Sequence, residues 1–263
     1  MEILGKTFKV EKEYLDFIVE NEDLIKETKK ATIKLADGFG SSTVSVDRKL
    51  ENVSKGVLDV EKTELTVKVA INTTNIIDSH SDMHVKGLWD ENLKQRGDKI
   101  LHLQEHKRTF DAVISRGDSL KAYAKEYTWK ELGYDLKGTT QALMFDSTIS
   151  KTVNEFMFEQ YSKGFVTEHS VGMQYVKMIT CIDDEDYPVQ KENWDKYAPL
   201  VANKDALEGR KVFWAVTEAK AIEGSAVLMG SNSFTPTVSI KEDPTEEELK
   251  NEAKLNAFKK WLG

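Results

Sequence analysis

Two histidines flank a glutamate in residues 102–106, which read HLQEH. His102, Glu105 and His106 follow the H-x-x-E-H order in which some zinc peptidases carry two ligands and a general base on one helix. Residues 100–106, however, alternate between apolar and polar side chains, which predicts a strand. On a strand the two histidines share a face but stand about 13 Å apart, at roughly 3.3 Å per residue. A zinc peptidase therefore stays only as an alternative interpretation.

A second candidate for metal binding lies in a turn-like segment. Asp78, His80, Asp82 and His84 alternate along it. Carboxylates and imidazoles are plausible metal ligands. Strict alternation would place the four side chains on one face, but the segment is turn-like, so a solvated loop is the preferred interpretation.

A serine gives a different chemistry. Ser170 lies in the stretch EHSVGM, whose alternation predicts a strand with His169 pointing away from Ser170. A serine hydroxyl becomes a nucleophile when a neighbouring base takes its proton, and histidine can do so near neutral pH. Gly172 allows close approach of the backbone, and its amide could help to bind an oxyanion. The residues alone give this hypothesis weak support.

Strands and one helix must position these residues. The helix is predicted over 152–163, with Thr152 and Glu155 as a capping box and Gly164 as its stop. Alternating segments predict strands in 64–71, 100–106, 112–116, 120–127, 139–145, 165–178, 212–222 and 224–230, the last two as a strand pair. The order lacks regular βαβ alternation, so it predicts a mostly antiparallel β or α+β domain.

The chain divides into a core and two extensions. Residues 1–45 are predicted as an N-terminal helical extension and 241–263 as a C-terminal helical tail. The main domain is then 46–240, with an insertion at 182–210.

Composition narrows the class of protein. The 263 residues carry a formal net charge of −8, which argues weakly against general nucleic-acid binding. Cys181 is the only cysteine, so there is no disulfide framework and a reducing compartment is expected. Neither a signal peptide nor an apolar run of the roughly 20 residues needed to span a bilayer is visible, so no membrane association is expected.

Residues 64–240, about two-thirds of the chain, resemble the prohead (capsid maturation) proteases of tailed phages, which are related to the herpesvirus assemblins. The motifs occur in the family's order. They are the turn DSHSDMHVKGLW, the strand ILHLQEH ending in His106, the helix, Ser170 in EHSVGM, and AIEGSAVLMGSNSFTPT with Glu223, Ser225 and Asn232. Met173 and Gly230 depart from the family's usual residues, and the insertion at 182–210 blurs the match before Glu223.

The resemblance implies a serine endopeptidase with an assemblin-like β-barrel surrounded by a few helices. Ser170 would be the nucleophile, His106 the general base and Glu223 the third member of the triad. No metal or other cofactor is implied.

Other residues remain candidates for parts of this site. Gly172 and Arg116 are candidates for the oxyanion hole. Glu218 and His169 are alternative third members, and His84 is an outside candidate.

The resemblance also implies a biological setting. The expected substrates are the scaffolding protein, the N-terminal region of the major capsid protein and the protease itself, inside the viral procapsid in the host cytoplasm. A homo-oligomer is possible, and the terminal extensions would dock the enzyme or be trimmed. The alternative is a catalytically inactive capsid-internal scaffold or structural protein with the same fold.

Overall fold

The computed structural model describes residues 1–31 and 63–242, which form a mixed α+β fold. The helices are α1 (Glu11–Glu20), α2 (Glu22–Ala31), α3 (Asp90–Arg96), α4 (Glu155–Ser162) and α5 (Pro188–Tyr197). The strands are β1 (Glu2–Ile3), β2 (Lys6–Thr7), β3 (Glu64–Thr73), β4 (Asp82–His84), β5 (Leu101–Gln104), β6 (Val113–Ser115), β7 (Leu120–Thr128), β8 (Thr139–Ser150), β9 (Glu168–Ile182), β10 (Val212–Val227) and β11 (Thr237–Glu242).

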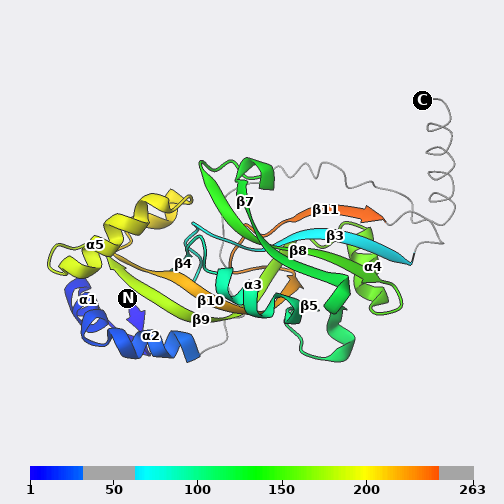
Figure 1. The fold of residues 1–263 in the computed structure, drawn as a ribbon. Helices are drawn as coiled ribbons and strands as arrows, with labels where there is room; N and C mark the ends of the chain where they lie inside the picture. The colour runs from blue at the N-terminus through cyan, green and yellow to red at the C-terminus, as the bar shows by residue number, and fades with distance from the viewer. Residues whose placement is uncertain (32–62, 243–263) are drawn as a thin grey trace.

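β10 organises the sheet that carries the candidate site. It pairs with β9 in antiparallel fashion along its whole length. Its other edge pairs in parallel first with β4 and then with β5, which in turn pairs with β6. Strands that are far apart in sequence therefore meet on one strand (Figure 1).

The predicted strand pair at 212–222 and 224–230 is wrong, because β10 continues through Glu223 and Gly224 without a turn. Gly224 is instead needed for close packing between the two sheets. A Cβ there would lie 2.5 Å from Phe145 Cε2 and 2.7 Å from Ile71 Cγ2. The glycine thus lets β10 approach the second sheet closely.

That second sheet has the order β11-β3-β8-β7 and shares a core cluster with the first. The packing buries apolar residues of both sheets, including Ile71, Phe145, Val171 and Val216, in one core cluster. The described strands form open sheets, so the expected assemblin-like β-barrel is not confirmed.

The central helix exists, but it begins later than the sequence predicted. α4 starts at Glu155, and the side chain of Asn154 accepts a hydrogen bond of 3.0 Å from the Met157 amide. The predicted capping box at Thr152 is therefore wrong. Asn is as good an N-cap as Ser or Thr, and here it lies at the residue where the helix begins.

The N-terminal helices pack against the main domain. Leu15, Ile18 and Ile25 are buried in the main core cluster. At the end of α2, Lys29 Nζ lies 2.5 Å from Asp82 Oδ1, and the Asp82 side chain is fully buried. The Tyr175 hydroxyl donates a hydrogen bond of 2.9 Å to the other Asp82 oxygen. The helical character predicted for 1–45 is thus confirmed for α1 and α2, and the remainder lies outside the described residues.

The predicted insertion at 182–210 contains α5 and two short 3-10 helices between β9 and β10. α1, α2 and α5 gather at one end of β9 and β10, whereas β5 and α4 lie toward the other end (Figure 1). The predicted helix in the 241–263 tail lies outside the described residues.

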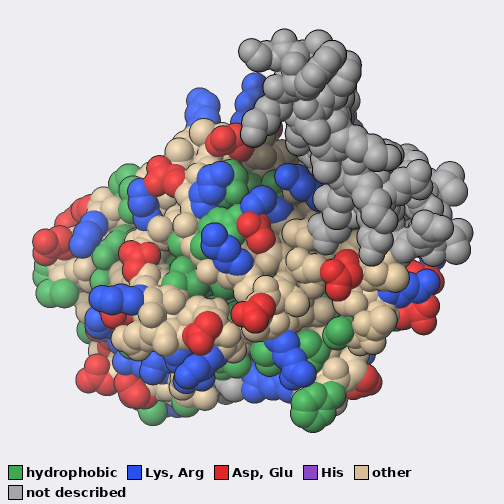
Figure 2. Space-filling model, turned by 45° about the vertical axis from the view of Figure 1, so that its right-hand side comes forward, with side chains coloured by type: hydrophobic (Ala, Val, Ile, Leu, Met, Phe, Trp, Pro, Cys, Tyr) green, Lys and Arg blue, Asp and Glu red, His purple; other side chains and the backbone are tan. Residues whose placement is uncertain are grey.

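The molecular face in Figure 2 carries acidic and basic side chains interspersed, with small hydrophobic patches between them. In the described part of the chain, every helix is too short or too polar to cross a membrane.

We expect Lys29→Met to destabilise the fold by about 3–5 kcal/mol, because it removes the cation that forms an ion pair with the buried Asp82 carboxylate. Urea denaturation measures the change. Lys30→Met is the matched control, since among the described residues Lys30 forms an ion pair only with the exposed Glu27, and it should cost at most about 1 kcal/mol. Equal losses in the two variants would contradict the role of Lys29.

Candidate active site

His106 lies in a tight turn directly after β5. The strand ends at Gln104, two residues earlier than the alternation predicted. Glu105 and His106 have φ values of 48° and 55°, in the left-handed region. The Glu105 amide donates a hydrogen bond of 2.9 Å to the Ala226 carbonyl, which holds the turn against β10.

The turn places the His106 ring against a buried carboxylate. His106 Nδ1 lies 2.6 Å from Glu223 Oε1, and the Glu223 side chain is 1% exposed. The Ser225 hydroxyl donates a hydrogen bond of 2.6 Å to Glu223 Oε2 and accepts one of 3.0 Å from the His106 amide. Both carboxylate oxygens are therefore engaged, and His106 is held at two points, its ring nitrogen Nδ1 and its backbone amide.

The other ring nitrogen of His106 has no such partner. Nε2 is buried, and no described residue forms a hydrogen bond with it. A carboxylate at Nδ1 favours the tautomer that carries its proton there, which leaves the Nε2 lone pair as a proton acceptor. Nε2 is therefore available to accept a proton from a nearby donor.

Ser170 lies on the neighbouring strand, directly opposite Ser225 in the β9–β10 register. Opposite residues of an antiparallel pair point to the same face, with Cβ atoms about 4.5–5.5 Å apart. Ser170 is 6% exposed. No hydrogen bond joins Ser170 to His106 among the described residues. β10 lies between the strand that carries Ser170 and β5, so the structure brings the two predicted residues to the same sheet without a contact between them.

Gly172 has a role that the sequence did not reveal. It lies opposite Glu223, and a Cβ built on it would overlap Glu223 Oε1 and lie 2.8 Å from Glu223 Cδ. Only glycine leaves room for the carboxylate to lie across β9. Its predicted role as an oxyanion donor is not tested by this contact.

The alternative third members lie elsewhere. Glu218 forms an ion pair with the exposed Lys177. His169 points into the core, where its Nε2 lies 2.9 Å from the Tyr161 hydroxyl and its Nδ1 lies 3.1 Å from the Thr235 carbonyl. His169 does point away from Ser170, as the alternation predicted. The geometry thus favours Glu223.

His102 does not share a face with His106, contrary to the strand prediction. Its Nδ1 lies 2.8 Å from Ser147 Oγ and its Nε2 lies 3.1 Å from the Tyr161 hydroxyl. Burial, with His169 nearby, holds the pKa of His102 well below its usual value, so the ring stays neutral. Because the left-handed turn follows Gln104, His106 reaches the other side of the sheet.

The metal hypotheses find no support in this geometry. His102 and His106 lie on opposite sides of the sheet. The described residues contain no group of three or more His, Cys, Asp or Glu side chains arranged to hold a metal ion. In the second candidate segment, Asp82 pairs with Lys29, and His84 Nδ1 lies 2.8 Å from the Asn72 amide nitrogen.

Arg116 lines a pocket together with Glu223, so the structure brings this oxyanion candidate near the site. The same pocket contains Arg108, which sequence reasoning missed. Its position immediately after HLQEH and Lys107 was the only available signal. Sequence reasoning also recognised Ser225 only as part of a motif, not as the link between Glu223 and His106.

Comparison with known proteins gave no match to a family model, a curated protein or a solved structure.

We expect Gly172→Ala to destabilise the fold by about 1–3 kcal/mol, because the new methyl group overlaps the Glu223 carboxylate. In a Glu223→Ala background the same change should cost at least about 1 kcal/mol less, which a double-mutant cycle in urea measures. Gly97→Ala is the control, since a Cβ there meets no atom closer than 3.9 Å. An equal loss of stability in both backgrounds would show that the Glu223 side chain is not the reason why position 172 requires glycine.

Asp78 gives a pH-dependent prediction. Burial and the neighbouring Asp82 carboxylate raise the Asp78 pKa to about 7. An acid whose pKa is higher in the folded than in the unfolded state favours folding below about pH 4, and this contribution is lost as the pH rises through 7. We expect the stability of Asp78→Asn relative to wild type to increase by about 1 kcal/mol as the pH rises from 4.5 to 8. The partial exposure of the side chain limits the size of this effect. Thermal unfolding at both pH values measures it; parallel profiles would contradict the raised pKa.

Proposed function

We propose that this chain is a serine endopeptidase with Ser170 as nucleophile, His106 as general base and Glu223 as the third member. The observation that carries the proposal is the buried pair of His106 and Glu223, on the face to which Ser170 belongs. The second ring nitrogen forms no hydrogen bond with a described residue. A buried carboxylate–imidazole pair is costly to build, because the carboxylate must be taken out of water.

The proposed chemistry uses His106 Nε2, which forms no hydrogen bond with a described residue. His106 Nε2 takes the Ser170 proton while the serine oxygen attacks the scissile carbonyl, giving a tetrahedral intermediate. Glu223 stabilises the imidazolium through Nδ1–H. His106 then protonates the leaving amine, and water hydrolyses the acyl-enzyme by the reverse roles.

Two features support the assignment of Glu223 in particular. Ser225 occupies its second oxygen, so the carboxylate cannot rotate away from the ring. Gly172 leaves it space above β9. The third residue is thus held by two neighbours that belong to the motifs that resemble the prohead proteases.

The biological role that we propose rests on the resemblance of residues 64–240 to those proteases. The enzyme would act inside the viral procapsid in the host cytoplasm, on scaffold, on the N-terminal region of the major capsid protein and on itself. An assemblin-like arrangement of the two packed sheets is part of this proposal. The alternative is an inactive capsid-internal protein, which the lack of a hydrogen bond between His106 Nε2 and any described residue would suit.

We expect Ser170→Ala and His106→Ala to lower processing by about 10⁴-fold or more, and Glu223→Gln by about 10²–10⁴-fold. Full-length protein is co-expressed with its capsid protein, and cleavage is followed by gel and mass spectrometry. A fluorophosphonate probe should label Ser170 in the wild-type protein.

Matched controls are Ser162→Ala on α4 and Glu218→Gln on β10, which should both process normally. Unchanged processing in the Ser170 and His106 variants would refute the serine mechanism. Absence of processing and of labelling in the wild type would favour the inactive structural protein. Loss in Glu218→Gln but not in Glu223→Gln would reassign the third residue.

A further inference from the structure

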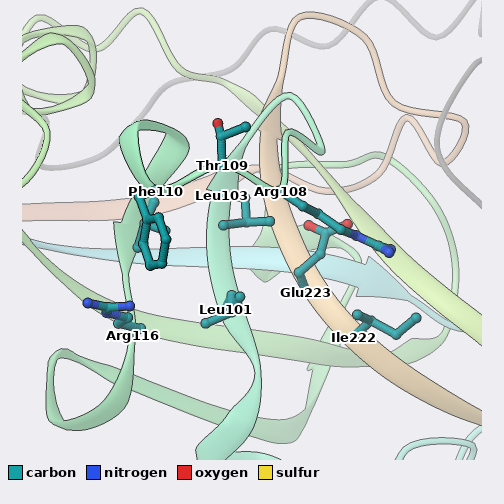
Figure 3. A pocket seen from close by; sticks show the side chains of 9 residues that line it. Leu101, Leu103, Arg108, Thr109, Phe110, Arg116, Ile222 and Glu223 are labelled. Carbon is teal, nitrogen blue, oxygen red and sulfur yellow. The ribbon is translucent and has the colours of Figure 1, made fainter.

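A pocket of about 220 Å³ opens beside the His106–Glu223 pair. Its apolar wall includes Leu101 and Leu103 from β5, Val113 from β6 and Ile222 from β10. Glu223 lines it as well, so the pocket borders the proposed third member of the triad (Figure 3). The wall is formed by strands and not by loops, and its shape is therefore fixed by the sheet.

Two arginines flank this apolar wall. Figure 3 shows Arg108 on the Glu223 side of Leu101 and Arg116 on the opposite side. Both side chains are exposed, and neither forms an ion pair with a described residue. The nearby Lys107 pairs with Glu105, and the one carboxylate that lines the pocket, Glu223, is engaged by His106 and Ser225.

The pocket therefore has an excess of positive charge on a chain whose net charge is −8. Guanidinium groups bind carboxylates through two parallel hydrogen bonds, a geometry that lysine does not offer. The apolar wall between them suits an aliphatic side chain. A segment with an aliphatic residue next to Glu or Asp complements both features.

Phe110 supplies a second observation. It lines the pocket from a short 3-10 helix, Phe110–Ala112, and is 87% exposed. A phenyl ring left in water beside an apolar wall gains free energy when a ligand covers it. Figure 3 shows the ring next to the wall, on the side away from Ile222.

We propose that this pocket, which we call the arginine-flanked pocket, selects substrate segments that carry an aliphatic residue adjacent to Glu or Asp. The aliphatic side chain packs against Leu101, Leu103 and Phe110. The acidic side chain is bound by Arg108 or Arg116. The inference rests on the proposed endopeptidase function and specifies the peptides that this site accepts.

Binding tests the pocket apart from catalysis. Full-length Ser170→Ala protein is titrated into a fluorescein-labelled hexapeptide that contains adjacent leucine and glutamate, and anisotropy is measured. A matched peptide with glutamine in place of glutamate should bind at least about fivefold more weakly. The difference should shrink as salt is raised from 50 mM to 500 mM, because exposed ion pairs are screened.

Variants locate the binding site. In the Ser170→Ala background, Arg108→Gln and Arg116→Gln together should remove the preference for glutamate over glutamine, and Phe110→Ala should weaken both peptides alike. Arg96→Gln on α3 removes an exposed arginine outside the pocket and should leave the preference unchanged.

The two proposals fail separately. Equal binding of both peptides, or a preference that survives loss of Arg108 and Arg116, overturns the assignment of the pocket even if Ser170 is the nucleophile. Selective binding that depends on both arginines supports the pocket even if Ser170 proves to have no catalytic role.

Discussion

The buried carboxylate of Glu223 is the constraint on which the rest of the site depends. Removing a carboxylate from water costs several kcal/mol unless other groups replace the lost hydration. His106 and Ser225 do so, each at one oxygen. Three local features follow from that arrangement: a left-handed turn that brings His106 over the strand, a serine two residues after the glutamate, and a glycine on β9 where any Cβ would displace the carboxylate.

Much of the fold could be predicted because alternation is local. β3, β7, β8 and β9 appear where apolar and polar residues alternate, and α4 appears where they do not. Two errors arose where tertiary packing decides. Gly224 was predicted to begin a separate strand but lies inside β10 against Phe145. Thr152 looks like a helix cap, yet Asn154 caps α4. In both cases the local sequence pattern is the same for the correct and the incorrect assignment.

The candidate site was predictable as a set of residues but not as a geometry. Ser170, His106 and Glu223 came from the order of motifs, and β9, β5 and β10 do bring their segments together. The left-handed conformation at Glu105 and His106 has no sequence signal, since neither residue is glycine. The pairing of Ser225 with Glu223, and the arginines around the pocket, depend on register and on which strands become neighbours.

The two histidines of HLQEH show how position in the sheet decides chemistry. His102 faces the second sheet, where it contacts Phe145 and Ser147 of β8 together with Tyr161 of α4, and burial keeps it neutral. His106 lies four residues later, after a turn that carries it to the other side of β5, where a carboxylate meets its ring. Had the strand continued to His106, both rings would face the core. Because β5 ends at Gln104, His102 is a structural histidine whereas His106 is a candidate base. For the same reason the two rings lie on opposite sides of the sheet and cannot bind one zinc ion.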